Sequence, residues 1–198
     1  MILFRDGESV LGVTQTAHSA LTGHLANAWV ARAELPWDAL LTAAAIHDLG
    51  WGRWELTPQI NPDTGWPYQF YGVPDLEYAE IWARGTDEAA SFGRLVGLLV
   101  SRHFTRLAGR REGLRPLVDR ERSRQAALTS TLDLDVATLD ACTELLARWD
   151  GLSLDICGGR EPELHDWPFT ADRLTLSFDA RELPAGAVET ITVELTRP

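Results

Sequence analysis

Apolar residues recur at helical spacing through most of the chain. Residues 15–33 carry Leu21, Leu25 and Trp29 on one stripe, behind Thr14 or Thr16 as a capping residue. We expect further helices over residues 36–48, 75–84, 86–107, 112–130 and 134–150. The pattern therefore predicts a mainly α fold.

The two ends of the chain alternate apolar and polar residues instead. Residues 2–14 place short apolar runs on either side of Asp6-Gly7, a strong tight-turn pair. The segments RLTLSF (173–178) and TITVEL (190–195) alternate in the same way. We expect the two hairpins to form one small antiparallel sheet against the helices. The predicted organisation is a single domain, 1–198, with a hairpin at 1–14, a helical core at 15–157, and a linker and hairpin at 158–198.

Composition adds limits to this picture. With 198 residues and 45% hydrophobic content, the chain can bury a sizeable core. No apolar run approaches the roughly 18 residues of a membrane span, and the first residues lack the features of a signal peptide. Cys142 and Cys157 lack a metal-type CxxC spacing, which favours reduced thiols. We therefore expect a cytoplasmic protein with no membrane partner.

The charge of the chain argues against nucleic acid as a partner. The net charge is −11, which opposes nonspecific binding to phosphates. All 18 basic residues are Arg, so lysine nucleophiles and Schiff bases are excluded. Many of these Arg lie between Arg102 and Arg124. A solvated helix face is favoured there, and an anion-binding patch is the alternative.

Several polar residues lie on the apolar faces of the predicted helices. His18 shares its stripe with Leu21, and His103 ends a stripe that begins at Phe92. His24 lies on a weaker face and is expected either at the surface or behind the ligating residues. One such residue alone is more often a satisfied core residue than a ligand. Several together each carry a burial penalty, and a shared cation would satisfy them all. The candidates are His18, His47, Asp48, His103 and Asp150.

The segment after His47-Asp48 is rich in Pro, Gly and aromatic residues. It is too long for an ordinary connector, and compact loops of this kind are often functional. We expect residues 51–71 to line or cover a small-molecule pocket. In the alternative, the rings fill the gap between the helices and the sheet. The candidate substrate-binding residues are Trp51, Trp54, Trp66, Tyr68, Phe70 and Tyr71.

The order of the polar residues resembles the HD superfamily of metal-dependent hydrolases. His18 in AHSALTGHLA, then HDLG, then a helical His103 and a distal Asp150 follow the pattern His…HD…His…Asp. Nearly the whole chain is similar to an uncharacterised HD-like family, domain of unknown function 3891. That similarity rests on Q-x-x-H, HDLGWGRWE, P-x-TG-x-P-x-x-F at Pro62–Phe70, LLVSRHF and WDGLSLDIC. The HD resemblance implies a helical bundle around a metal.

Carried over residue by residue, the resemblance implies one divalent transition metal (Fe, Mn, Zn, Ni or Co). Its implied ligands are His18, His47, Asp48 and Asp150. His103 would ligate a second ion, the alternative to a single ion. Dinuclear members usually bring two histidines between the HD pair and the last Asp, whereas this chain has one; Trp51 also stands where many phosphohydrolases have Lys.

The implied reaction is hydrolysis of a small molecule, with a phosphorylated substrate favoured, by a metal-activated water. Asp48 would help to orient that water. Glu55 is a candidate acid or base, with an exposed salt bridge as its alternative role. Arg102, beside His103, is the first candidate for a phosphate contact, and Arg53 is the second.

Two other classes of function stay open. A few HD-fold proteins use a di-iron pair to activate oxygen, so an oxygenase is the first alternative. The second is a non-catalytic, metal-stabilised module in which the aromatic residues hold a small ligand.

Overall fold

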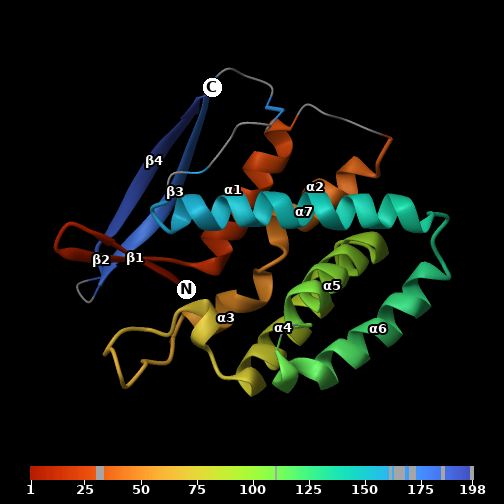
Figure 1. Ribbon diagram of the computed structural model, residues 1–198, viewed down its shortest axis with the longest axis horizontal. Helices are drawn as coiled ribbons and strands as arrows, with labels where there is room; N and C mark the ends of the chain where they lie inside the picture. Colours follow the sequence, from red (N-terminus) through yellow and green to blue (C-terminus); the bar gives the residue numbers. More distant parts are fainter. Residues whose placement is uncertain are drawn as a thin grey trace.

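We describe the fold from a computed structural model of the chain, for residues 1–29, 34–109, 111–160, 162, 168–169, 173–183 and 186–196. The protein is mainly α, with a small four-stranded antiparallel sheet at one end (Figure 1). The helices are α1 (Gln15–Ala28), α2 (Trp37–Ile46), α3 (Gly52–Glu55), α4 (Asp75–Ala90), α5 (Arg94–Ala108), α6 (Arg115–Thr129) and α7 (Val136–Cys157). Short 3₁₀ turns span Leu49–Trp51, Phe70–Gly72 and Glu112–Leu114.

The sheet joins the two ends of the chain. Its strands are β1 (Ile2–Asp6), β2 (Ser9–Val13), β3 (Arg173–Leu183) and β4 (Val188–Thr196), in the order β1-β2-β3-β4. The first hairpin turns at Gly7, where a φ of +59° suits glycine. Val13 of β2 pairs with Ala180 of β3, which connects the two hairpins. The predicted sheet is confirmed.

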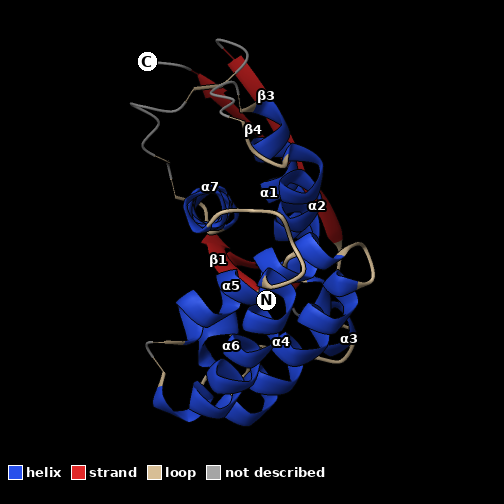
Figure 2. Ribbon diagram, turned by 90° about the vertical axis from the view of Figure 1, so that its right-hand side faces the viewer, coloured by secondary structure: helices blue, strands red, loops and turns tan. Residues whose placement is uncertain are grey.

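Helices α1 and α7 lie between the sheet and the other helices. Figure 2 looks along α7 and shows β3 and β4 on one side of it and α4 to α6 on the other. Leu21 and Leu25 of α1 share one apolar cluster with Leu176 and Phe178 of β3. Trp149 of α7 belongs to a second cluster, formed mostly by α2, α4 and α5. The site described below draws its residues from the helices where these layers meet.

Several helix boundaries differ from those predicted. Helix α4 continues to Ala90, and the chain breaks at residues 91–93 before α5 begins. Gly93 has a φ of +150°, which a side chain would strain, so the expected helix over 86–107 is interrupted there. Phe92 is consequently 57% exposed and does not share the stripe of His103.

The ends of two other helices also differ from those predicted. Helix α7 extends beyond the predicted end at Asp150 to Cys157, because the apolar residues after Asp150 continue the packed face. Helix α1 ends at Ala28, and residues 30–33 of its predicted span lie outside the described residues. Much of the predicted linker after residue 158 does so too. None of the described helices is long and apolar enough to span a membrane.

Candidate metal centre

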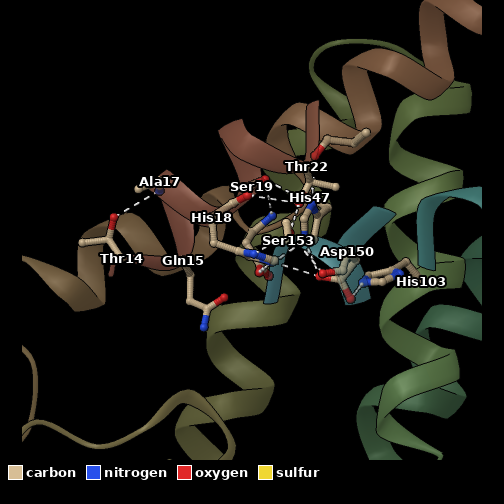
Figure 3. Close-up of polar contacts among 12 residues, drawn as sticks. Thr14, Gln15, Ala17, His18, Ser19, Thr22, His47, His103, Asp150 and Ser153 are labelled. Carbon is tan, nitrogen blue, oxygen red and sulfur yellow. Dashed lines mark hydrogen bonds and ion pairs between the residues drawn. The ribbon is translucent and has the colours of Figure 1, made fainter. Parts of the chain in front are cut away.

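Five buried polar side chains converge where α1, α2, α5 and α7 meet. They are His18, His47, Asp48, His103 and Asp150. His18 comes from α1, His103 from α5 and Asp150 from α7. His47 and Asp48 follow directly after α2. Figure 3 shows His18, His47 and His103 directed toward Asp150. The structure therefore brings together all five residues that the sequence singled out.

Asp150 lies at the middle of this cluster. Its Oδ1 atom is 2.9 Å from Nε2 of His18 and 3.2 Å from Nε2 of His47. Its Oδ2 atom is 3.5 Å from Nε2 of His103. Oδ2 of Asp48 completes the set at 3.4 Å from Nε2 of His47 and 3.7 Å from Nε2 of His18. Each histidine thus presents the same ring nitrogen to the carboxylates.

A close backbone contact holds the His47-Asp48 turn in place. Gly50 packs so tightly on α4 that an added Cβ would lie 2.3 Å from the carbonyl oxygen of Ile81 and 2.7 Å from the amide nitrogen of Gly85. Arg84 also donates to the Gly50 carbonyl oxygen at 2.9 Å. The glycine after the HD pair therefore lets the turn sit directly against α4.

The tautomer of His47 follows from its hydrogen bonds. Its Nδ1 lies 3.0 Å from the carbonyl oxygen of Ala44, which can only accept. Nδ1 therefore carries the proton and donates, and the hydroxyl of Ser19 at 3.1 Å is its second neighbour. In the neutral ring, Nε2 then points a lone pair at two carboxylates. That arrangement is repulsive unless a proton or a cation lies between them.

The ring of His18 is oriented in the same sense. Thr22 donates its hydroxyl proton to the His18 carbonyl oxygen at 3.0 Å. Ser153 lies 2.6 Å from the Thr22 hydroxyl and donates to the Asp150 carbonyl oxygen at 3.0 Å. With its one proton used in this way, the Ser153 hydroxyl oxygen accepts from Nδ1 of His18 at 2.7 Å. This leaves Nε2 of His18 facing Asp150. Such partners on the far ring nitrogen are typical of metal-ligating histidines.

The protonation of the cluster depends on burial and on these ion pairs. Burial alone lowers the pKa of His47, but Asp48 and Asp150 outweigh it and raise that pKa well above 6.5. Burial alone raises the pKa of Asp150, but His18 and His47 outweigh it and hold that pKa well below 3.8. Burial lowers the pKa of His103 to about 4, so this ring is neutral at pH 7.

The five side chains fit a divalent cation. Two carboxylates and three imidazole nitrogens suit first-row divalent metals. Ligands about 2.1 Å from such an ion lie about 3.0 to 3.4 Å from one another in octahedral or tetrahedral geometry. The distances from the aspartate oxygens to the histidine Nε2 atoms, 2.9 to 3.7 Å, span that range. The donors form two overlapping groups, His18 with His47 and Asp48, and His47 with His103 and Asp150, and within each group the candidate ligand atoms lie within 4.8 Å of one another. Each group could hold a metal ion, and protons can also satisfy the same pairs.

A small cavity of about 30 Å³ adjoins the cluster. It has room for only a few atoms. Among the described residues, no arginine lines it, and both of its charged residues are aspartates. Its walls consist of Gln15, His18, Asp48, Trp51, Phe70, Tyr78, Trp82, His103, Leu107, Asp150 and Leu154.

Only part of the aromatic segment reaches this cavity. Trp51 and Phe70 line it, whereas Trp54, Trp66, Tyr68 and Tyr71 do not. The segment is fixed against β1, where Gln69 bonds the amide and carbonyl groups of Leu3, both at 2.9 Å. The indole of Trp54 donates to Glu77, and Tyr71 is 65% exposed. Of the six aromatic residues predicted to bind substrate, two therefore line the cavity.

The two predicted catalytic residues outside the cluster do not line the cavity. Arg102 lies on another face of α5, where it donates to Thr143 and pairs with Asp140, because neighbouring residues of a helix are about 100° apart. Glu55 is buried, and its carboxylate accepts from the backbone N–H of Gln15 at 2.7 Å and lies 3.2 Å from the Met1 nitrogen. Arg102 therefore does not face this cavity, its phosphate contact stays a prediction, and Arg53 is exposed.

Sequence reasoning did not assign roles to Gln15, Tyr78 and Trp82, which line the cavity, or to Ser19 and Ser153, which orient the histidines. Gln15 lies one helical turn before His18, so the Q-x-x-H spacing was a usable signal. Tyr78 and Trp82 are one turn apart on α4, and no local pattern links that helix to the histidines.

A comparison with protein families gives one match. The family model with the description "Protein of unknown function (DUF3891)" matches residues 1–165. No curated protein and no solved structure matches the chain.

Proposed function

The chain belongs to the family described as Protein of unknown function (DUF3891), and we propose that it is a metal-dependent hydrolase of a small molecule. The observation that carries this proposal is the position of His47 Nε2, which lies 3.4 Å from Oδ2 of Asp48 and 3.2 Å from Oδ1 of Asp150. The resemblance to the HD superfamily, in which the same order of residues holds a catalytic metal, supports it.

Four residues would hold the ion: His18, His47, Asp48 and Asp150. A divalent cation bound there supplies Lewis-acid chemistry, in that it lowers the pKa of a coordinated water toward 7 and polarises the bond to be cleaved. Asp48 and Asp150 also line the cavity, so their oxygens can orient a water beside the ion. His103 is neutral and lines the same cavity, where it can contact the substrate.

Apolar side chains form much of the wall of this cavity. Trp51 and Trp82 are almost completely buried beside the two aspartates, and Phe70 and Leu107 close the same space. Electrostatic interactions are stronger in such an apolar surrounding. The proposal covers hydrolysis in general, because Arg102, the first candidate for a phosphate contact, does not line the cavity.

Elemental analysis of protein purified without chelator tests the metal. We expect about one transition metal per chain in the wild type and at least a tenfold loss in Asp48→Ala and Asp150→Ala. His24→Ala is the matched control, because His24 is exposed on the same helix as His18. Equal and near-zero metal in all four proteins would overturn the metal centre.

Hydrolysis is tested on the loaded protein with p-nitrophenyl acetate and p-nitrophenyl phosphate. Release of p-nitrophenol by the wild type and by His24→Ala, but not by Asp150→Ala, supports the proposal. Bound metal without hydrolysis of either ester contradicts it and favours the binding module. Iron with an absorbance that depends on air favours the oxygenase instead.

A further inference from the structure

Gln15 is a buried amide that no other described side chain satisfies. It is the first residue of α1, one turn before His18, and its backbone N–H is held by Glu55 at 2.7 Å. Its side chain is 1% exposed, yet its Nε2 has no hydrogen-bond partner among the described residues. A buried amide without a partner costs about 1–3 kcal/mol. The residue therefore needs an explanation other than fold stability.

The amide group belongs to the cavity of the proposed metal centre. Gln15 lines that cavity together with Asp48 and Asp150. Figure 3 shows its side chain leaving α1 beside His18, outside the network of dashed hydrogen bonds. Glu55 fixes the backbone of Gln15, and the side chain lines the same cavity as the two aspartates without being part of their ion pairs. It is a free hydrogen-bond donor at a proposed reaction site.

The charges around the cavity limit the ligand that this donor can bind. Two aspartates balance the charge of one divalent ion, and the chain has no lysine. Arg102 pairs with Asp140 on another face of α5. Tyr78, another polar wall residue, has a pKa raised by burial, so its phenol is neutral. A phosphate dianion would leave uncompensated negative charge in a buried site, which is unfavourable.

We propose that Gln15 is a substrate-binding residue and that its side-chain amide donates to a neutral carbonyl oxygen. The substrate class is then a small uncharged ester or amide rather than a phosphate ester. This inference rests on the proposed hydrolase for its reaction, but the binding itself does not. Cleavage of such a bond adds a water oxygen to the carbonyl carbon, breaks the bond to the alcohol or amine, and transfers a water proton to that leaving group.

Direct binding is measured by NMR on the zinc-loaded protein. The probes are acetamide and, as an anion of similar size, methyl phosphate. The Gln15 side-chain amide signal is identified by its loss in Gln15→Met, a variant of similar length that removes the donor. We expect acetamide to shift this signal saturably and methyl phosphate to leave it unchanged.

Two variants distinguish a role of Gln15 in ligand binding from a role in the stability of the fold. We expect Gln15→Met to weaken acetamide binding about fivefold, the scale of one neutral hydrogen bond, with unchanged metal content and thermal stability no lower than wild type. Gln59→Met is the control, since Gln59 is exposed and pairs with Glu77 away from the cavity. Gln15→Met should also lower kcat/KM for p-nitrophenyl acetate without shifting the pH profile of the reaction.

Failure of this inference differs from failure of the hydrolase. Acetamide that binds at Gln15 without any ester hydrolysis supports the inference and contradicts only the proposed reaction. Methyl phosphate that binds while acetamide does not, or equal acetamide affinity in Gln15→Met and wild type, overturns the inference. Hydrolysis of p-nitrophenyl phosphate in preference to the acetate also overturns the inference about Gln15, but it supports the proposed hydrolase function.

Discussion

Nε2 of His47 lies 3.2 Å from Oδ1 of Asp150, although the two residues are 103 positions apart in the chain. Because Nδ1 of His47 donates to the Ala44 carbonyl, a positive charge has to lie between Nε2 and the carboxylate. In the metal-free protein that charge is a proton, and in the loaded protein it is the ion. The proton and the ion therefore compete for one position.

This competition predicts opposite effects of pH on the free and loaded proteins. His47 has a raised pKa, so its contribution to metal-free stability is complete below 6.5 and is lost as the pH rises through the higher folded value. Asp150 has a lowered pKa, so its contribution is present above 3.8 and is lost as the pH falls through the lower folded value. Zinc binding removes the proton, so its stabilising effect grows with pH.

Thermal unfolding between pH 5 and 9, with and without zinc, checks this prediction. We expect the rise in Tm caused by zinc to be larger at pH 8 than at pH 6, and the cluster's contribution to metal-free stability to decline over the same range. His24→Ala should behave as wild type, because that ring is exposed. A zinc-induced rise that shrinks with increasing pH would contradict the assignment of the proton to His47.

Ser153→Ala is expected to weaken zinc binding about 10- to 100-fold, the usual effect of removing the partner that orients a ligating histidine. Ser153 accepts from Nδ1 of His18 at 2.7 Å, and without it that ring is free to turn. Isothermal titration calorimetry measures the affinity. The control is Ser123→Ala, whose exposed hydroxyl donates to the Asp119 carbonyl oxygen within α6. Equal affinities in both variants would show that the hydroxyl does not orient His18.

Gly50→Ala is predicted to destabilise the fold by about 1–3 kcal/mol, the usual cost of overpacking. The added methyl would meet the backbone of Ile81 and Gly85, which cannot move aside as a side chain can. The matched control is Gly151→Ala in α7, where a Cβ meets nothing within 4 Å and a gain of up to about 1 kcal/mol is expected. Urea denaturation measures both, and equal changes would refute the close contact.

Arg102→Ala is expected to leave metal content and KM for either p-nitrophenyl ester unchanged. Its guanidinium pairs with the exposed Asp140, so the loss of stability should be at most about 1 kcal/mol. Steady-state kinetics and elemental analysis check this outcome, with Arg106→Ala as the comparison, because Arg106 forms the equivalent pair with Glu144. A selective rise in KM for the phosphate ester would contradict this prediction and show that Arg102 contributes to phosphate binding.

Much of the fold follows from local patterns that the sequence displays. Alternation predicted the strands, because successive side chains of a strand point to opposite faces. Apolar stripes placed His18, His103 and Asp150 on buried faces, and all three are buried. Local patterns were less informative for the aromatic segment, whose path depends on the contact of Gln69 with Leu3, 66 residues away. The position of Arg102 was available from helix geometry, since adjacency in sequence separates two residues by about 100°.

The sequence by itself determined most of the elements and the burial of the five polar residues that any fold of this chain must satisfy. Only the tertiary structure decided that those five meet, that Asp150 lies between the histidines, and that Gln15 rather than Arg102 faces the cavity. The physical reason is the separation along the chain of the residues that interact. Side-chain periodicity is imposed by hydrogen bonds within one helix or between paired strands, whereas the meeting of side chains depends on how distant segments pack.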